Sequence, residues 1–562
     1  MLGKRSGQVN LFSVESRLRK KVGEDSFYVF LADHRHEFFS DEDFAMLYCA
    51  DNGRNSVPPS LLATAVILQT FDRASDQEAT DRAQFDQRWQ LALGLGDEEV
   101  PFAKSTLCVF RNQLIIHKKA KFIFQKGIEH LRRNGFVKKH KIRLALDTTA
   151  IFGKGAVEDT FNLLAEGLRQ VLKALAEIDS KTQEDFAAAH DFSRYMAPSF
   201  KGTFSIDWDN ETERQTVLDS LVADCERVLA LASATLNQYP PDSAEAKQIA
   251  EATDLLSKLL AQDVRHNQPG KVEIIDGVAQ DRIVSVHDPE MRHGRKSATQ
   301  RFDGYKASVA VETDSQVIAD VDVLPANAHD STNASSLVAE SAKTLEAPVE
   351  GIVGDGAYGS VEARLDARTD GYEITAPVGR LSQGGRFTKD DFTIDLDKNT
   401  VTCPAGQTTS TAHVRHTSTL RGTIFTHRSF RFSAQKCRGC PVRAQCLKPT
   451  TYQRAVLVHE HEALLQEAKT FQRTDEYRAH YRERVVVEHR IARLSRLGIR
   501  KARYFGSSKV LFQLAMAAAV SNLTLFATSL LPAGPFIAPL LLVSFMLLLV
   551  ISRIDYRKLS CF

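Results

Sequence analysis

The chain has 562 residues, of which 43% are hydrophobic and 25% are charged. This length exceeds what one compact core accommodates and predicts two to four modules, and the composition is that of an ordinary globular protein. The net charge of +2 excludes a global electrostatic field that would by itself indicate a nucleic-acid partner.

Cysteine usage and the first residues predict a reducing compartment. Eight cysteines in a chain of this length do not suggest a disulfide framework. The N-terminal segment 1–22 lacks the apolar stretch of a secretory signal. We therefore expect a cytoplasmic protein.

Local charge is uneven along the chain. Residues 117–143 hold ten Lys/Arg against one Glu, and residues 473–503 hold ten Lys/Arg against four acids. The acidic segment 157–260 balances them in the total. Two basic blocks on a neutral chain fit a polyanion-binding surface, and they fit two solvated helix faces equally well.

The first predicted elements are helices within residues 57–125. One begins after Ser75, which has a glutamate three residues later, and one begins at Ser105 as its cap. Three short helices, the last carrying Arg111 and Asn112, are compatible with a helix-turn-helix DNA reader or with a plain helical bundle.

A strand follows at 141–149 and ends on Asp147. Residues 157–260 then return to amphipathic helices with a period of 3.6. Strand-like runs resume within 281–325, a helix follows, and a second apolar strand ends on Asp355 between two glycines. This order predicts an α/β fold with large insertions.

Asp147 and Asp355 are expected to emerge at strand ends of one sheet, where open α/β sheets bind their ligands. Two neighbouring carboxylates repel each other unless a cation lies between them, and Mg²⁺ favours carboxylates together with phosphate oxygens. The flanking glycines are expected to let a backbone or a phosphate approach closely. The plainer interpretation is that each aspartate is an ordinary strand-end residue.

A third motif lies at 481–506. Tyr481, Arg484, Glu488 and Ser495 have spacings that place them on one face of a helix. Such a face could offer Glu488 to a metal and Arg484 to a phosphate. The alternative is an exposed basic helix with an Arg484–Glu488 ion pair.

The ordered set of Asp147, Asp355 and Glu488 resembles the DDE transposases of bacterial insertion sequences. The family's Tyr-x2-Arg-x3-Glu-x6-Lys pattern is matched at Tyr481, Arg484 and Glu488, and it fails at Ser495, where Arg493 or Arg496 could substitute. Further segments that carry the resemblance extend it over most of residues 40–525.

The resemblance implies an RNase H-like mixed-sheet core and a transposase that cleaves its element's DNA ends and transfers strands. Asp147, Asp355 and Glu488 would hold two Mg²⁺ ions, for which Mn²⁺ could substitute. The implied partners are the terminal inverted repeats, the target DNA and further copies of the chain. The implied DNA-binding residues are Tyr481, Arg484, Arg493, Arg496, Lys296, Lys306 and, for the N-terminal helices, Arg111.

Four cysteines form a second candidate site in a turn-rich segment. Cys403, Cys437, Cys440 and Cys446 could close a structural Zn²⁺ site, although their spacing is wider than that of a usual zinc knuckle. Free thiols and an iron–sulfur cluster are the alternatives, and three histidines could replace one of the thiols: His413, His416 and His427.

The C-terminal segment carries no charged residue from Val510 to Ile551. Its apolar run 536–552 is at the lower limit of what spans a bilayer. We expect a buried terminal helix or a read-through tail, and a membrane anchor is the alternative.

The predicted architecture has five parts. They are a helical N-terminal DNA-binding domain (1–130), an RNase H-like core (140–156, 271–395 and 451–530), a helical insertion (157–270), a cysteine-rich zinc module (396–450) and an apolar tail (531–562). The alternative to a transposase is a DNA-binding protein that has kept the fold and lost catalysis. A membrane-anchored nuclease is a third interpretation.

Overall fold

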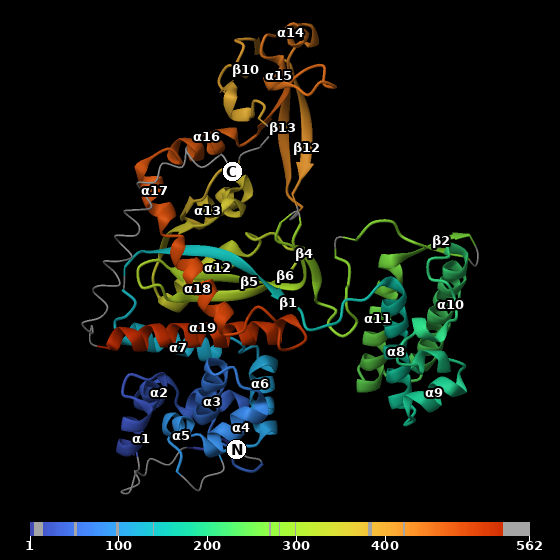
Figure 1. Cartoon of the computed structure of the whole chain (residues 1–562), viewed down its shortest axis with the longest axis vertical. Coiled ribbons are helices and arrows are strands. Elements are labelled where there is room, and N and C mark those ends of the chain that lie inside the picture. The colour runs from blue at the N-terminus through green and yellow to red at the C-terminus, as the bar shows by residue number, and fades with distance from the viewer. Residues whose placement is uncertain are drawn as a thin grey trace, which may run out of the picture. The chain divides into compact units, whose positions relative to one another are not determined.

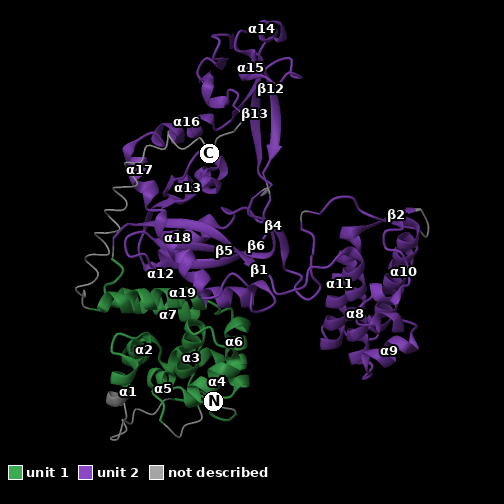
Figure 2. Ribbon diagram, viewed as in Figure 1, with its two compact units in different colours: residues 1–138, 516–562 green, residues 139–515 purple. Residues whose placement is uncertain are grey.

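The computed structural model describes residues 1–4, 15–49, 53–96, 101–138, 140–268, 271–279, 281–297, 299–379, 385–419 and 422–531 (Figure 1). The chain divides into two compact units (Figure 2). The N-terminal unit comprises residues 1–138 and 516–562, and the sheet unit comprises residues 139–515. The apolar run 536–552 lies outside the described residues.

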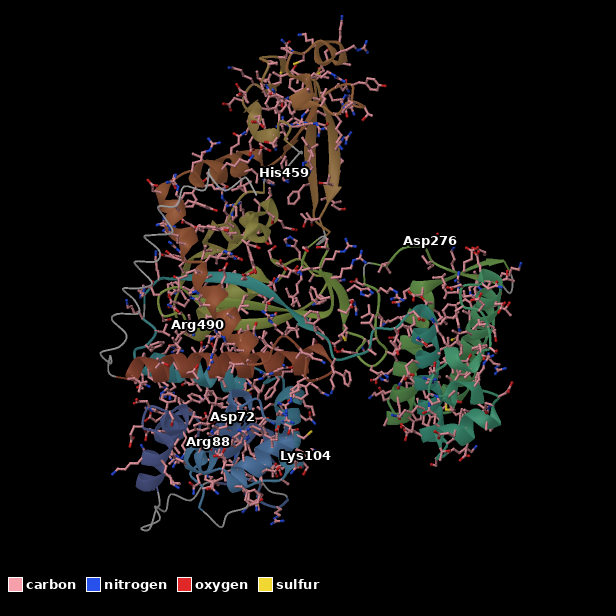
Figure 3. All side chains as sticks on the ribbon, viewed as in Figure 1. Asp72, Arg88, Lys104, Asp276, His459 and Arg490 are labelled. Carbon is pink, nitrogen blue, oxygen red and sulfur yellow. The ribbon has the colours of Figure 1, made fainter. Side chains whose placement is uncertain are left out.

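The N-terminal unit is helical. Its elements are α1 (Glu15–Val22), α2 (Phe27–Phe38), the 3-10 helix η1 (Asp41–Leu47), α3 (Pro59–Phe71), α4 (Asp76–Phe85), α5 (Gln87–Leu93), α6 (Lys104–Ile116) and α7 (Phe122–Arg133). Asp72, labelled in Figure 3, holds several of them together, since its carboxylate accepts hydrogen bonds from the Tyr28 hydroxyl (2.7 Å) and from the buried Trp89 indole (2.6 Å).

Capping side chains define the starts of two helices in this unit, α4 and α5. Ser75 and Glu78 form the predicted capping box of α4, in which each side chain accepts the other residue's backbone N–H. The single helix expected after Ser75 is divided at Asp86, whose side chain caps α5. The predicted cap at Ser105 is wrong, because α6 begins at Lys104 with Ala103 at the cap position.

The apolar helix α19 (Ser507–Leu530) ends the described chain. Within the described residues it is the one helix long and apolar enough to cross a membrane, and 72% of its most apolar window is buried inside the structure. From Met516 onward it belongs to the N-terminal unit, where Phe526 packs on Phe30 and Phe136. It is therefore a core helix, and this part of it lies with the N-terminal helices although the sequence analysis assigned it to the catalytic core.

The sheet unit is built on a mixed sheet. Its strands are β1 (Ile142–Phe152), β4 (Arg292–Arg295), β5 (Arg301–Glu312), β6 (Ile318–Pro325), β7 (Val349–Val353) and β8 (Glu373–Thr375). The order is β4-β5-β1-β7-β8, with β6 also paired to β5. β1 pairs antiparallel with β5 and parallel with β7, which confirms the predicted mixed α/β class. The strand expected at 281–288 is not formed.

Three helices pack near the sheet: α12 (Ala334–Leu345), α13 (Val361–Asp370) and α18 (Val485–Arg496). α18 packs on β1 and β5, and α12 packs on β5 and β6. Leu144, Ala145 and Leu146 are fully buried in the centre of β1, as expected for a strand with neighbours on both edges. Two short helices, α16 (Glu462–Phe471) and α17 (Asp475–Arg482), precede α18.

A helical module lies between β1 and β4 in the chain, in the segment where helices were predicted. It contains α8 (Thr160–Ile178), α9 (Gln183–Ala189), α10 (Glu211–Leu236) and α11 (Ala244–Asp263), with the short helices η2 (Ser193–Met196) and η3 (Lys201–Thr203) and the hairpin of β2 (Val264–Gln268) and β3 (Lys271–Ile274). Its own buried core includes Leu164, Leu168, Leu221 and Val228. Trp208 packs edge-on against Phe161 as part of this module.

The cysteine-rich segment forms two small sheets. They are β9 (Thr393–Asp395), β10 (Thr400–Thr402) and β11 (Thr408–Thr409), and β12 (Ala412–Ser418), β13 (Ile424–Arg431) and β14 (Ala455–His459). The helices η5 (Lys389–Asp391), α14 (Ala434–Arg438) and α15 (Arg443–Cys446) accompany them. Val401, Phe430, Val456 and Val458 form its core, with Cys403, Cys437 and Cys446 packed against it.

Candidate active site

Asp147 lies in the middle of β1. The prediction that β1 ends on Asp147 is wrong, because the strand continues to Phe152 by pairing with β5. The Asp147 side chain is 22% exposed and accepts a hydrogen bond from the Thr148 backbone N–H (2.8 Å). Burial raises the pKa of Asp147 to about 6, and the charges of Asp355 and Asp330 act in the same direction. The carboxylate therefore favours a cationic neighbour.

Asp355 follows the end of β7, as predicted. Its carboxylate accepts a hydrogen bond from the Ala357 backbone N–H (2.9 Å) and so caps the short helix η4 (Gly356–Gly359). β7 lies beside β1 in parallel, so the chain leaves the sheet at Asp355 next to the strand that carries Asp147.

The two glycines beside Asp355 have different roles. A Cβ atom at Gly354 would lie 2.6 Å from the ring of Tyr358, so this glycine makes room for a buried side chain of the protein itself. A Cβ atom at Gly356 would meet nothing within 4 Å. The expectation that both glycines admit a ligand is therefore wrong for Gly354, and only Gly356 faces open space.

Glu488 is linked to Asp147 by the side chain of Arg484, which contacts both carboxylates. Tyr481 lies on α17, whereas Arg484 caps α18 and Glu488 lies in its first turn. Because the helix is interrupted at Glu483 and Arg484, the predicted continuous helical face is not formed. The Arg484 guanidinium donates to Glu488 through one nitrogen and lies 3.3 Å from Asp147 Oδ2 through another.

Asp330 joins these acids. Lys306 Nζ donates to Asp330 and to the Ala328 carbonyl, both at 2.7 Å. Burial raises the pKa of Tyr358, and the charges of Asp147, Asp330 and Asp355 raise it further. One buried phenol is thus near three carboxylates.

The donor set suits a hard divalent cation. Three carboxylates from β1, the end of β7 and α18 supply the oxygen ligands that Mg²⁺ favours. Burial keeps the pKa of Asp147 raised even though the neighbouring Arg484 guanidinium lowers it. In the described part of the chain, one group of His, Cys, Asp or Glu residues has all its ligand atoms within 4.8 Å of one another, and the three acids of this site do not belong to it. The three carboxylates are therefore farther apart than ligands of a single bound ion, and Arg484 lies between two of them.

Most of the other predicted DNA-binding residues lie on the sheet unit. Tyr481 stacks on Tyr477 with ring centroids 5.5 Å apart. Arg496 is exposed, and Arg493 is half-buried one turn before it, with burial lowering its pKa. Lys296 is exposed after β4. Lys306, in contrast, is engaged by Asp330 and is only 13% exposed.

The predicted DNA contact of Arg111 is wrong. Its side chain is 5% exposed and forms a two-nitrogen ion pair with Asp76 at 2.6 and 3.0 Å, and it also donates to Gln69. A guanidinium buried with an acid partner inside a helical core cannot reach a base edge. Arg111 therefore joins α3, α4 and α6.

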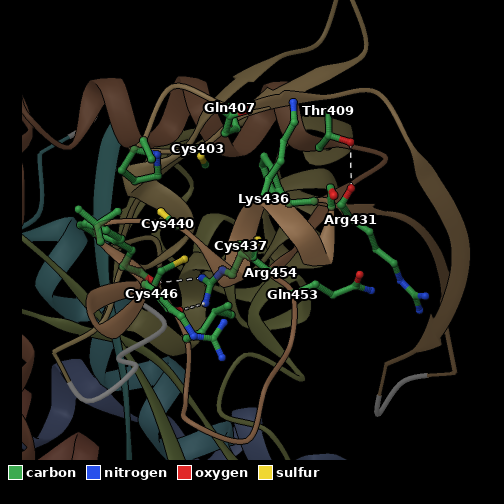
Figure 4. A pocket seen from close by; sticks show the side chains of 18 of the residues that line it. Cys403, Gln407, Thr409, Arg431, Lys436, Cys437, Cys440, Cys446, Gln453 and Arg454 are labelled. Carbon is green, nitrogen blue, oxygen red and sulfur yellow. Dashed lines mark hydrogen bonds between the residues drawn. The ribbon is translucent and has the colours of Figure 1, made fainter.

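The four predicted zinc ligands line one pocket of about 440 Å³ (Figure 4). They are Cys403, Cys437, Cys440 and Cys446. Burial raises the pKa of Cys446, and the other three thiols raise it further, which places all four in one electrostatic neighbourhood. His413 lines the same pocket, whereas His416 and His427 do not. As with the carboxylates, the sulfur atoms are not as close together as ligands of one bound ion.

The cysteine-rich module has a charge pattern that the sequence analysis missed. Residues 398–459 contain ten Lys/Arg and no Asp or Glu. β12 is exposed along nearly its whole length, with Arg415 among its exposed residues. The net charge of this segment is therefore strongly positive, although that of the whole chain is only +2.

Two segments match known protein families. Residues 16–113 match a transposase domain (DUF772), and residues 402–526 match a transposase DDE domain. Searches of curated proteins and of solved structures found no match. The second segment contains Glu488 and all four cysteines of the pocket, whereas Asp147 and Asp355 lie outside both segments. The matches confirm the resemblance to insertion-sequence DDE transposases.

Proposed function

We propose that this chain, which carries transposase domains, is an insertion-sequence transposase that cleaves DNA ends in a metal-dependent reaction and transfers the strands to a target. The observation that carries the proposal is the convergence of its three motif acids. Asp147 and Glu488 are joined by Arg484, and Asp355 follows the end of the neighbouring strand β7, close enough to shift the pKa of Asp147.

The sheet supports an RNase H-like assignment for the core. An acid in the centre of a middle strand, an acid at the end of the adjacent parallel strand and an acid on a packed helix together form the frame that a three-carboxylate nuclease requires. The pairing of β1 with β5 on its other edge fixes Asp147 opposite Val309, a buried residue, so the first acid rests on a rigid part of the molecule.

The proposed metal ligands are Asp147, Asp355 and Glu488. When bound, divalent ions would supply activation of water or a 3′-hydroxyl and charge stabilisation at phosphorus. Arg484 holds Glu488 towards Asp147, and its positive charge offsets part of the negative charge of both acids. Tyr358 closes the buried side of the site against water, and Lys306 holds Asp330 beside it.

DNA is the proposed partner, bound by surfaces that carry excess positive charge. Arg493 and Arg496 follow Glu488 on α18, and Lys296 is exposed on the same unit. The acid-free cysteine-rich module adds a second basic surface. Lys and Arg that neutralise backbone phosphates give a strongly salt-dependent affinity with little sequence preference. We propose that copies of the chain assemble on two DNA ends in the cytoplasm.

A structural Zn²⁺ is proposed for the cysteine pocket. Four thiols from separate turns of one small module match the ligand type and number of a structural zinc site. The ion would join the turn at Cys403 to α14 and α15, where Cys437 and Cys446 lie. Bound zinc per chain, measured before and after Cys440→Ser, tests this assignment, and an unchanged zinc content would contradict it.

The first experiment is cleavage of a DNA duplex built from the sequences that flank this gene, with Mg²⁺ or Mn²⁺. We expect nicking at a defined end by the wild type, and loss of nicking with retained DNA binding for Asp355→Ala. Asp370→Ala is the matched control, because Asp370 is an exposed acid at the end of α13.

The same experiment separates the alternatives. Binding without nicking by the wild type would favour a DNA-binding protein that has lost catalysis. Nicking that survives in Asp355→Ala would overturn the assignment of the acid triad. The membrane-anchored interpretation concerns residues 536–552, which lie outside the described residues, and it stays a prediction.

A further inference from the structure

Two histidines and a glutamate meet between α2 and α7 of the N-terminal unit, remote in sequence from the acid triad. His34 Nδ1 lies 3.1 Å from Glu37 Oε2, and His130 Nδ1 lies 3.7 Å from the same oxygen. One potential ligand atom from each residue lies within 4.8 Å of those of the other two, and no other His/Cys/Asp/Glu group of the described chain is as compact. We propose that His34, Glu37 and His130 bind one Zn²⁺ ion.

Both helices end at this site. Glu37 lies in the last turn of α2, which ends at Phe38, and His34 lies directly before that turn; His130 lies in the last turn of α7, which ends at Arg133. The C-terminus of a helix carries partial negative charge from its unpaired carbonyl groups. Two such termini beside one carboxylate create a local preference for a cation that does not depend on the ligand atoms themselves.

The most buried ligand is held in orientation by its surroundings. His130 is 4% exposed, and its ring packs edge-on against Phe38 (4.4 Å between centroids) and Phe526 (5.7 Å). Its Nε2 lies 3.1 Å from the Asn134 side-chain amide, so Nδ1 is the nitrogen that faces Glu37. The same amide nitrogen donates to the His130 backbone carbonyl (3.0 Å), which holds the Asn134 side chain beside the ring.

The donor set selects the class of ion. Two imidazole nitrogens and one carboxylate oxygen suit Zn²⁺ and similar divalent transition metals, whereas Mg²⁺ and Ca²⁺ favour oxygen ligands alone. Glu37 is 54% exposed and His34 is 24% exposed, so water can complete the coordination. The ion would tie α2 to α7 and so stabilise the packing of the N-terminal unit.

The test uses the full-length chain, stripped of metal with a chelator and titrated with Zn²⁺. We expect His34→Gln and Glu37→Gln to weaken one zinc-binding event at least tenfold, and to remove the rise in melting temperature that this event produces. His36→Gln is the matched control, because His36 is an exposed histidine on the same helix outside the group. The wild type and the three variants all keep the cysteine pocket, so any zinc bound there contributes equally to each titration.

Titration with Co²⁺ identifies the ligands. Cobalt held by nitrogen and oxygen gives visible absorption without the near-ultraviolet charge-transfer bands of thiolate ligands, and we expect this component to disappear in His34→Gln and Glu37→Gln. Equal ion counts and equal spectra for these variants, His36→Gln and the wild type would overturn the proposal. Because His34 and Glu37 are partly exposed, their variants decide the question even if a variant of the buried His130 does not fold.

Discussion

The guanidinium of Arg484 lies 3.3 Å from the carboxylate of Asp147 on β1, and it also bonds to Glu488 one turn further along α18. Residues separated by more than 300 positions are therefore joined at the centre of the candidate site. The arginine substitutes for the missing positive charge between two acids that would otherwise repel each other. Any divalent ion that enters must compete with it or displace it.

Replacing Arg484 by lysine should separate positioning from charge. Lysine keeps one positive charge but lacks the planar group that contacts both acids at once. We expect Arg484→Lys to fold and to bind DNA, with DNA cleavage reduced about tenfold to a hundredfold because Glu488 is no longer held towards Asp147. Arg482→Lys is the matched control, since Arg482 ends α17 close by in sequence. Equal cleavage rates for the two variants would show that the bridge is incidental.

The raised pKa of Asp147 predicts an unusual pH dependence of stability. Burial raises this pKa from 3.8 to about 6, so the folded protein binds a proton more readily than the unfolded chain between those values. Stability is therefore lost as pH rises from about 4 to about 6, because burial outweighs the opposing effect of the Arg484 charge on this pKa. An aspartate whose pKa is lowered by its ion pair behaves in the reverse way. In the presence of a chelator, Asp147→Asn should be more stable than the wild type at pH 7.5, by at most roughly 3 kcal/mol, and similar to it at pH 4.

Denaturant unfolding at the two pH values measures this difference, with Asp370→Asn as the control for an exposed acid. If the difference in free energy of unfolding between Asp147→Asn and the wild type stays constant with pH, the raised pKa does not belong to Asp147. Adding Mg²⁺ at pH 7.5 should raise the unfolding midpoint of the wild type and leave that of Asp147→Asn unchanged, because the ion favours the charged form of the ligand.

Arg111 gives a test of the corrected assignment in the N-terminal unit. Arg111→Ala leaves Asp76 without its buried partner and should lower the free energy of unfolding by about 3 kcal/mol. Arg88→Ala, which removes the exposed pair with Asp86 on α5, should cost less than about 1 kcal/mol. Chemical unfolding of both variants measures the difference. An Arg111→Ala protein of unchanged stability and weakened DNA binding would restore the original prediction.

The sequence predicted the parts of the fold that depend on local pattern. The helical insertion, the helix after Asp330 and the strand before Asp355 follow from apolar periodicity, and Ser75 with Glu78 defines a helix start by its own hydrogen bonds. It could not predict that β1 continues beyond Asp147, because that extension depends on pairing with residues of β5 more than 150 positions away. It also could not separate a buried Arg111 from an exposed one, since the partner Asp76 lies 35 positions earlier.

The candidate site shows the same division. The three acids could be named from their motifs, and the structure brings them into one region, but the role of Asp330 depends on Lys306 and on the turn at Ala328. Gly354 was interpreted as space for a ligand, whereas Tyr358 of the same loop fills that space. Contacts of this kind are set by packing between elements and leave no mark in local residue spacing.

The basic cysteine-rich module predicts a measurable salt dependence. Arg415, Arg438 and Lys448 are exposed, and no acid lies between residues 398 and 459 to neutralise them. If each contacts a DNA phosphate, their replacement by glutamine should lower the slope of log K against log salt concentration by about 3, because each phosphate contact contributes about 0.9. The matched control replaces Lys173, Lys181 and Lys258 of the helical insertion, each of which is paired with an acid. Fluorescence anisotropy with a labelled duplex at several salt concentrations measures both slopes. Equal slopes for the two triple variants would remove the module from the DNA-binding surface and leave that role to α18 and the residues around Lys296.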